Sequence, residues 1–205
     1  MSLLPIFVKL RDRLAVVVGG GAIAEGKIDG LFAAEARIRV VAPRVTRAIA
    51  EWIAEGKVEW RAEAFAPADL DGAYLVIAAT SAPGVNEAVF SEADARGILC
   101  NAVDDIEHCH FYYGSVVQRG DLQIAVSTNG KSPALAQRLR QELETQFGPE
   151  YEVWLEWLGA ARELLRASNS DSETNKKLLH QLASEPAFEQ FLRETRAREP
   201  RKGAA

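Results

Sequence analysis

The feature that most constrains this fold is a glycine-rich turn between an apolar run and a helical pattern. Residues 14–18 read Leu-Ala-Val-Val-Val, a continuous apolar run typical of a parallel strand covered on both faces. Residues 19–24 follow as Gly-Gly-Gly-Ala-Ile-Ala and fit G-x-G-x-x-A at the start of a helix expected over 22–34. Strand, turn and helix in this order predict a dinucleotide-binding unit of the Rossmann type.

Each position of the turn has a physical reason in such a unit. Gly19 permits the tight turn, Gly21 lets the backbone approach a pyrophosphate, and Ala24 lets helix and strand pack closely. The free N–H groups and positive dipole end of the helix suit phosphates. A glycine turn without a ligand is the alternative, and the flanking strand and helix favour the nucleotide.

The acid that usually holds the ribose is missing from this sequence. It should lie about 20 residues beyond the turn, where residues 40–44 read Val-Val-Ala-Pro-Arg. Arg44 could accept a 2′-phosphate or could be a solvated loop charge. The residues therefore leave NAD and NADP both open.

Strand and helix signals alternate through the first hundred residues, which predicts an α/β fold with a parallel sheet. Further strands are expected over 38–41, 58–60, 74–78 and 98–103, with one helix capped by Thr46 and another near 85–96. A hairpin follows, formed by 115–117 and 122–126 around Arg119-Gly120-Asp121. Ser132-Pro133 then begins a helix, whose apolar stripe is Leu135, Leu139, Leu143 and Phe147.

From Tyr151 the pattern is helical throughout, and it ends in a charged tail over 193–205 that we expect to fray. The expected organisation is a nucleotide-binding Rossmann domain over 1–113, a dimerisation segment over 114–148 and a small helical domain over 149–205. The hairpin and the stripe of the following helix lack partners in a doubly wound sheet. They are therefore expected to form a homodimer interface.

Asp104 is the candidate catalytic residue, because it lies at the expected carboxyl end of the fifth strand, where open parallel sheets bind ligands. A turn cap is the alternative role. Asp105 has the same chemistry but is expected to point elsewhere. His108, Cys109 and His110 resemble a metal cluster, yet neighbours on a strand alternate faces and two ligands make no zinc site, so no metal site is expected.

Charge and composition exclude several classes of protein. The net charge of −5 argues against a nucleic-acid binder, and no segment approaches the ~20 apolar residues of a membrane helix. Two cysteines, Cys100 and Cys109, suggest no disulfide framework. We therefore expect a cytoplasmic protein that binds neither nucleic acid nor membrane.

A series of short motifs resembles the precorrin-2 dehydrogenase family, which includes the N-terminal part of bifunctional sirohaem synthases. The resemblance covers roughly residues 1–147, and it is specific because the short motifs occur in the same order as in the family. They are Leu4-Pro5-Ile6-Phe7, Val18-Gly19-Gly20-Gly21 with Ala24 and Lys27, Val40-Val41-Ala42-Pro43, Ala78-Ala79-Thr80, Val85-Asn86, Asn101-Ala102-Val103-Asp104, Cys109 with Phe111, Arg119-Gly120-Asp121-Leu122, Ile124-Ala125-Val126-Ser127-Thr128 and Gly130-Lys131-Ser132-Pro133-Ala134.

The resemblance implies an activity, partners and site residues. The family oxidises precorrin-2 to sirohydrochlorin with NAD, and some members also insert ferrous iron. Asp104 matches its essential aspartate, and its nucleotide-contact positions match Ala22, Ile23, Pro43 and Arg44. The missing ribose acid is normal there, which favours NAD. The family is an intertwined homodimer, Thr128 is expected near the substrate entrance, and Lys131 and Arg119 are expected to anchor tetrapyrrole carboxylates.

The chain departs from the family pattern at Gly26, at Gly114 and at Glu35, where a glycine normally ends the first helix in a left-handed conformation. Two other functions stay open from the sequence. One is a non-catalytic, NAD-sensing regulatory Rossmann module, which needs neither Asp104 nor the 130–133 loop. The other is an interaction protein with a helical tail, which leaves the glycine turn unexplained.

Overall fold

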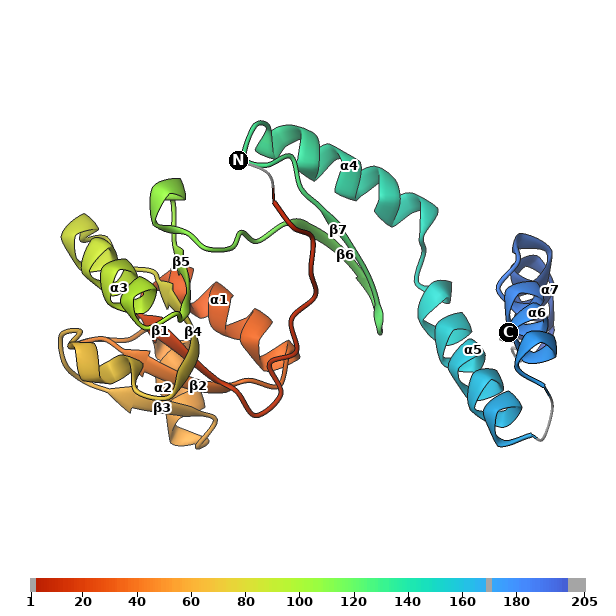
Figure 1. Ribbon diagram of the computed structural model, residues 1–205, viewed down its shortest axis with the longest axis horizontal. Helices are drawn as coiled ribbons and strands as arrows, with labels where there is room; N and C mark the ends of the chain where they lie inside the picture. The colour runs from red at the N-terminus through yellow and green to blue at the C-terminus, as the bar shows by residue number, and fades with distance from the viewer. Residues whose placement is uncertain (1–2, 169–170, 199–205) are drawn as a thin grey trace, which may run out of the picture. The chain divides into compact units, whose positions relative to one another are not determined.

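A computed structural model describes residues 3–168 and 171–198, which form two compact units divided between Tyr113 and Gly114 (Figure 1). Of the tail expected to fray over 193–205, residues 193–198 are helical instead, and 199–205 lie outside the described residues. None of the helices in the described ranges combines the length and apolar character that crossing a membrane requires.

The first unit is a five-stranded parallel sheet in the order β3-β2-β1-β4-β5, which confirms the predicted α/β fold. Its strands are β1 (Leu14–Val18), β2 (Arg37–Val41), β3 (Val58–Arg61), β4 (Ala73–Ala78) and β5 (Leu99–Ala102). Its α-helices are α1 (Ala22–Ala33), α2 (Arg47–Ala54) and α3 (Pro83–Ala95). Two short 3-10 turns that the sequence did not indicate, η1 (Pro67–Leu70) and η2 (Ile106–His108), complete the unit.

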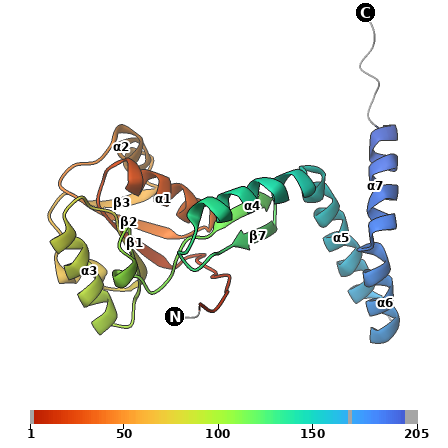
Figure 2. The same cartoon turned by 90° about the horizontal axis from the view of Figure 1, so that it is seen from above.

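Alternate residues of the strands supply two separate cores, one on each face of the sheet. On one face, Val17 and Ile77 pack with Ala24 and Ile28 of α1 and Ile49 of α2. The opposite core is built on alternate strand residues and α3, and contains Val16, Val18, Val76, Val89 and Cys100. Figure 2 shows α1 and α2 on one side of the sheet and α3 on the other. Both faces are covered, which is why the strands read as continuous apolar runs.

The end of α1 shows how Glu35 occupies the position where a glycine was expected. Glu35 adopts a left-handed conformation with φ of 56°. The N–H of Glu35 donates to Phe32 and that of Ala36 to Leu31, the pair of bonds that defines a Schellman motif. The departure at Glu35 therefore leaves the local geometry intact, at a cost of about 1 kcal/mol for a left-handed non-glycine residue.

The second unit contains the predicted hairpin and helices. Strands β6 (Ser115–Arg119) and β7 (Leu122–Val126) pair antiparallel, and α4 (Pro133–Gln146) packs against them. The hydroxyl of Ser132 accepts a bond from the N–H of Leu135, as its predicted capping role requires. Helices α5 (Glu150–Ala167), α6 (Ser172–Leu182) and α7 (Glu185–Arg198) follow, with the rings of Tyr151, Trp154 and Phe188 in contact.

Gly20 has no room for a side chain, although the motif leaves this position unspecified. A Cβ at Gly20 would lie 2.2 Å from the carbonyl oxygen of Arg44. We predict that Gly20→Ala destabilises the protein by about 1–3 kcal/mol, the usual cost of overpacking. Thermal or urea unfolding measures this loss.

Gly30→Ala is the matched control, because Gly30 lies within α1 and its Cβ would meet nothing within 4 Å. Replacing a helical glycine by alanine there should stabilise by about 0.5–1 kcal/mol. Equal stability of the two variants would show that the turn relaxes without cost.

Candidate active site

The glycine turn is in backbone contact with the two loops beside it. Gly19 has a φ of 122°, open only to glycine, and a Cβ there would lie 2.3 Å from the carbonyl oxygen of Ala79. The N–H of Gly19 donates to the carbonyl of Val41 at 2.9 Å, and the carbonyl of Gly20 accepts from the N–H of Thr46. The turn after β1 is therefore fixed between the loops that follow β2 and β4.

The N-terminus of α1 is open, which a phosphate-binding helix requires. Gly21 is its N-cap and supplies no side chain, and a Cβ there would meet nothing within 4 Å. The helix's own bonding begins with the N–H of Glu25, which donates to Gly21. The preceding N–H groups and the dipole end thus fit a pyrophosphate. Ala22 and Ile23 are exposed beside them, and Ile23 is 54% exposed despite its apolar side chain.

Two other predicted nucleotide-contact residues lie at the end of β2. Pro43 and Arg44 are exposed immediately beyond the strand, next to the glycine turn. No carboxylate follows β2 at this edge, since residues 42–44 are Ala-Pro-Arg. The turn, the open helix end and these loop residues fit an NAD-type dinucleotide and would hold its pyrophosphate and adenosine portions.

Asp104 lies just beyond β5, at the same carboxyl edge of the sheet. The N–H of Val103 donates to Ala78 at 2.9 Å, which ties the chain to β4 up to this point. Asp104 then turns left-handed, with φ of 60°. Aspartate tolerates this conformation better than most residues, and such outliers concentrate at functional sites. The turn presents an exposed carboxylate beside the sheet.

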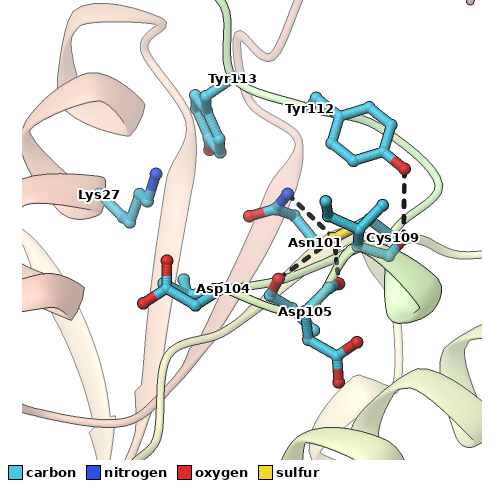
Figure 3. Close-up of a pocket in the computed structure, with 10 residues that line it drawn as sticks. Lys27, Asn101, Asp104, Asp105, Cys109, Tyr112 and Tyr113 are labelled. Carbon is cyan, nitrogen blue, oxygen red and sulfur yellow. Dashed lines mark hydrogen bonds between the residues drawn. The ribbon is translucent and has the colours of Figure 1, made fainter. Parts of the chain in front are cut away.

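A pocket of about 200 Å³ opens beside Asp104 (Figure 3). Its lining comes from α1, from the loop after β5 and from the segment that returns along the edge of the sheet. The lining residues are Lys27, Asn101, Ala102, Val103, Asp104, Asp105, Ile106, Cys109, Tyr112 and Tyr113. The helix that would hold the pyrophosphate therefore also contributes to the pocket that contains Asp104.

Lys27 is the cation of this pocket. Its ammonium nitrogen lies 3.9 Å from the centre of the Tyr113 ring. Burial lowers the pKa of Lys27, while the negative charge of Asp104 opposes this shift. Figure 3 shows Lys27 and Asp104 facing the same space.

Asn101 and Cys109 fix the returning segment. The amide of buried Asn101 donates to the carbonyl of Phe111 at 2.9 Å and to the Cys109 sulfur at 3.4 Å. The Cys109 thiol in turn donates to the carbonyls of Ala102 and Asp105, both at 3.1 Å. Burial raises the pKa of Cys109, so the thiol stays protonated and available as this donor.

Asp105 points away from the pocket cation, as expected, and pairs with His108 at 2.6 Å. This contact lowers the pKa of Asp105 and raises the pKa of His108. His108 lies in the 3-10 turn η2 and not on a strand, so the alternation of faces expected for residues 108–110 does not apply to it. His110 accepts from the N–H of Cys100 at 3.1 Å and contacts Asp94, and both imidazoles lie 5.0 Å from Phe90.

The predicted substrate residues Thr128, Lys131 and Arg119 belong to the second unit. The Thr128 hydroxyl donates to the carbonyl of Ser132 and accepts from its N–H, which closes the loop before α4. Lys131 is exposed in that loop. The Arg119 guanidinium donates to the carbonyls of Gln118, Glu144 and Phe147. These bonds hold the hairpin against the end of α4, and anchoring of substrate by Arg119 remains a prediction.

Sequence reasoning assigned no role to Lys27, Asn101, Tyr112 or Tyr113. A signal for Lys27 was present, because Ala24, Lys27, Ile28 and Leu31 follow the i, i+3, i+4, i+7 spacing of one helix face. A lysine within an otherwise apolar, core-facing stripe needs a reason. The tyrosines had no such signal, because an irregular segment positions them.

Comparison with known proteins identifies relatives across most of the chain. The family described as "Putative NAD(P)-binding" matches residues 6–115, and the family "Sirohaem biosynthesis protein central" matches residues 119–146. Siroheme synthase 1 of Serratia proteamaculans (strain 568) is 42% identical over 171 residues, which are 82% of this chain and 36% of that protein. The siroheme synthase of Methylobacillus flagellatus is 48% identical over 151 residues, 74% of this chain and 32% of that protein.

Among solved structures, "SirC, precorrin-2 dehydrogenase" superposes with a TM-score of 0.78 at 27% identity. The match covers 94% of this chain and 98% of that one. The chain thus spans about a third of the length of the siroheme synthases, but nearly the whole of the solved dehydrogenase.

Gly21→Asp tests the nucleotide site. We predict that this variant folds, because the position has open space, and that it loses NAD binding. The new side chain would occupy the place of the pyrophosphate and bring a like charge to it. Calorimetric titration with NAD measures the affinity, and circular dichroism checks the fold.

Gly30→Asp provides the control, since it adds the same charge to the same helix about 13 Å further along, nine residues at 1.5 Å each. It should keep the NAD affinity of the unmodified protein. An unchanged affinity in Gly21→Asp would rule out the turn as the pyrophosphate site.

Proposed function

This chain belongs to the family of precorrin-2 dehydrogenases and sirohaem synthase N-terminal domains, and we propose that it oxidises precorrin-2 to sirohydrochlorin with NAD. Because the chain spans about a third of the named siroheme synthases, the proposal is confined to the reaction named for the solved structure that it matches almost end to end. No observation on this chain favours iron insertion in addition to oxidation, so we restrict the activity to the dehydrogenase.

One observation carries the proposal. An open, glycine-capped helix N-terminus and an exposed carboxylate lie at the same carboxyl edge of one parallel sheet, and α1 contributes to both the phosphate site and the pocket. A regulatory module that only senses NAD would need the first of these features and not the second. The pairing therefore favours an enzyme over a sensor.

The oxidation removes a hydride and a proton from the macrocycle, and NAD, when bound, supplies the hydride acceptor. The proton needs a base, and Asp104 is the proposed one, because its carboxylate is exposed at the pocket and held there by a fixed backbone turn. Lys27 lines the same pocket and brings a positive charge near this carboxylate. Gly19, Gly20 and Gly21 bring the backbone close to the pyrophosphate, with Ala22, Ile23, Pro43 and Arg44 around it.

We further propose that the protein is a homodimer built on the segment 114–148. Among the described residues, β6 and β7 pair only with each other, so each has an outer edge without a partner. Val117 is fully buried, whereas Val116 is 43% exposed and Leu135 is 38% exposed. Covering these surfaces with a second copy would pair the free strand edges and bury the apolar side chains.

We also place the protein in the cytoplasm. The free thiols of Cys100 and Cys109 fit this reducing compartment.

Replacing Asp104 tests the catalytic assignment. We predict that Asp104→Ala keeps its NAD affinity and loses at least ~100-fold in kcat, the lower range for general acid–base catalysis. An anaerobic assay that follows NADH and sirohydrochlorin measures the rate. His108→Ala and His110→Ala, which change side chains that do not line the pocket, should cost less than ~10-fold. A near-normal rate in Asp104→Ala would transfer the role to Asp105 or to a water-mediated route.

The dimer has its own test. Light scattering should give twice the chain mass at micromolar concentration, and Val116→Asp should shift the protein toward the monomer by placing a charge in an apolar contact. Val153→Asp is the control, because Val153 is exposed on α5 outside the segment. A monomeric mass for the unmodified protein would contradict the proposal.

A further inference from the structure

Lys27 is a half-buried cation without an ion-pair partner in the described part of the chain. It lies in the core-facing stripe of α1, between Ala24 and Ile28, which are fully buried. No carboxylate of residues 3–168 or 171–198 lies within 4.0 Å of its ammonium nitrogen. Most other cations of the sheet unit, such as Arg39, Arg61 and Arg96, are paired with acids.

Leaving this cation unpaired has an energetic cost. Burial removes water from the ammonium group and lowers the pKa of Lys27. The ring of Tyr113 offsets part of this cost through its negative face, because the ammonium nitrogen lies 3.9 Å from the ring centre. Burial raises the pKa of Tyr113 to about 12, so the phenol is neutral and cannot act as a counter-ion. The ammonium group therefore has capacity for an anion.

Packing and a hydrogen bond hold the ring beside Lys27 in place. Tyr113 packs on Phe111 with ring centres 5.7 Å apart, and the carbonyl of Phe111 accepts the bond from buried Asn101. The ring beneath the ammonium is thus tied to the end of β5, the strand that leads into Asp104. A ligand that contacts Lys27 in this pocket also approaches the Asp104 carboxylate.

We propose that Lys27 and Tyr113 form an anion-binding subsite that takes a carboxylate of the substrate beside Asp104. The inference rests on the proposed function, because a tetrapyrrole with several carboxylate side chains is the substrate it names. Asp104 alone would repel such a polyanion. Lys27 offsets this charge and fixes one edge of the macrocycle at the reacting position.

The position of Lys27 along α1 assigns this anion to the substrate and not to the nucleotide. Lys27 comes five residues after Ala22, the first residue of the helix, which is a rise of about 7.5 Å. The pyrophosphate would bind at the N–H groups of the first turn, whereas the ammonium group of Lys27 lies over Tyr113 in the pocket. Loss of this charge should therefore affect the substrate and leave NAD affinity unchanged.

Lys27→Met removes the charge and keeps the length of the side chain. We expect the KM for precorrin-2 to rise ~10-fold or more, the effect of losing one charge-assisted hydrogen bond. The kcat and the Kd for NAD should stay within about threefold, and the salt dependence of KM should weaken. Lys27→Arg, which restores the charge, should recover most of the affinity. Lys57→Met is the control, since Lys57 is exposed on the turn before β3 and pairs with Glu55.

A second measurement does not depend on turnover. Titration with uroporphyrin, a polycarboxylate macrocycle that is not oxidised here, should show weaker binding to Lys27→Met by a similar factor. If the unmodified protein fails to oxidise precorrin-2, the proposed function fails while this titration still tests the subsite. An unchanged KM with a reduced kcat would make Lys27 a positioning residue for Asp104, and a weakened NAD affinity would place it in the nucleotide site. Either result, or no change in KM and uroporphyrin binding, overturns the subsite.

Discussion

Three loops meet at the carboxyl edge of the sheet, and they can do so because no side chain separates Gly19 from the carbonyl of Ala79 or Gly20 from that of Arg44. These contacts join the ends of β1, β2 and β4 through backbone alone. They place the N-terminus of α1 so that its free N–H groups face outward. They also hold together the carboxyl edge of the sheet, where Asp104 follows β5. A single methyl group at either glycine would push these loops apart. The nucleotide site and the pocket thus depend on the same close backbone approach.

Charge balance is the second constraint on the site. A carboxylate that is to act as a base must stay ionised, and a polyanionic substrate must nevertheless approach it. The two requirements conflict unless a cation is near, and α1 supplies that cation in Lys27. Holding an ammonium group half-buried costs free energy that the Tyr113 ring offsets only in part. The same helix therefore provides its positive dipole end to the nucleotide and a localised positive charge to the pocket.

Some parts of this arrangement follow from local patterns and others do not. The apolar runs over 14–18 and 74–78, the glycine motif and the Ser132-Pro133 cap each reflect the chemistry of neighbouring residues, and the elements lie where these patterns predicted them. The left-handed turn at Glu35 was likewise expected from its place after a helix. The 3-10 turn η2 was not indicated by the sequence; it begins after Asp105, whose carboxylate binds the imidazole three residues on. The close approach of Gly20 to the carbonyl of Arg44 could not be predicted, because the two residues are 24 positions apart.

The sequence by itself determined the parallel α/β sheet, the nucleotide turn and the placing of Asp104 at a strand's end, since each depends on periodicity, glycine spacing or a position relative to one strand. Only the tertiary structure decided which residues share a pocket with Asp104. Lys27, Asn101 and Tyr113 lie on a helix, a strand and an irregular segment. They meet because α1 packs on the sheet and because the chain turns back through η2, so that Cys109 lies antiparallel to Asn101. No local pattern encodes a meeting of residues more than 70 positions apart. Packing and the hydrogen bonds of buried polar groups bring them together.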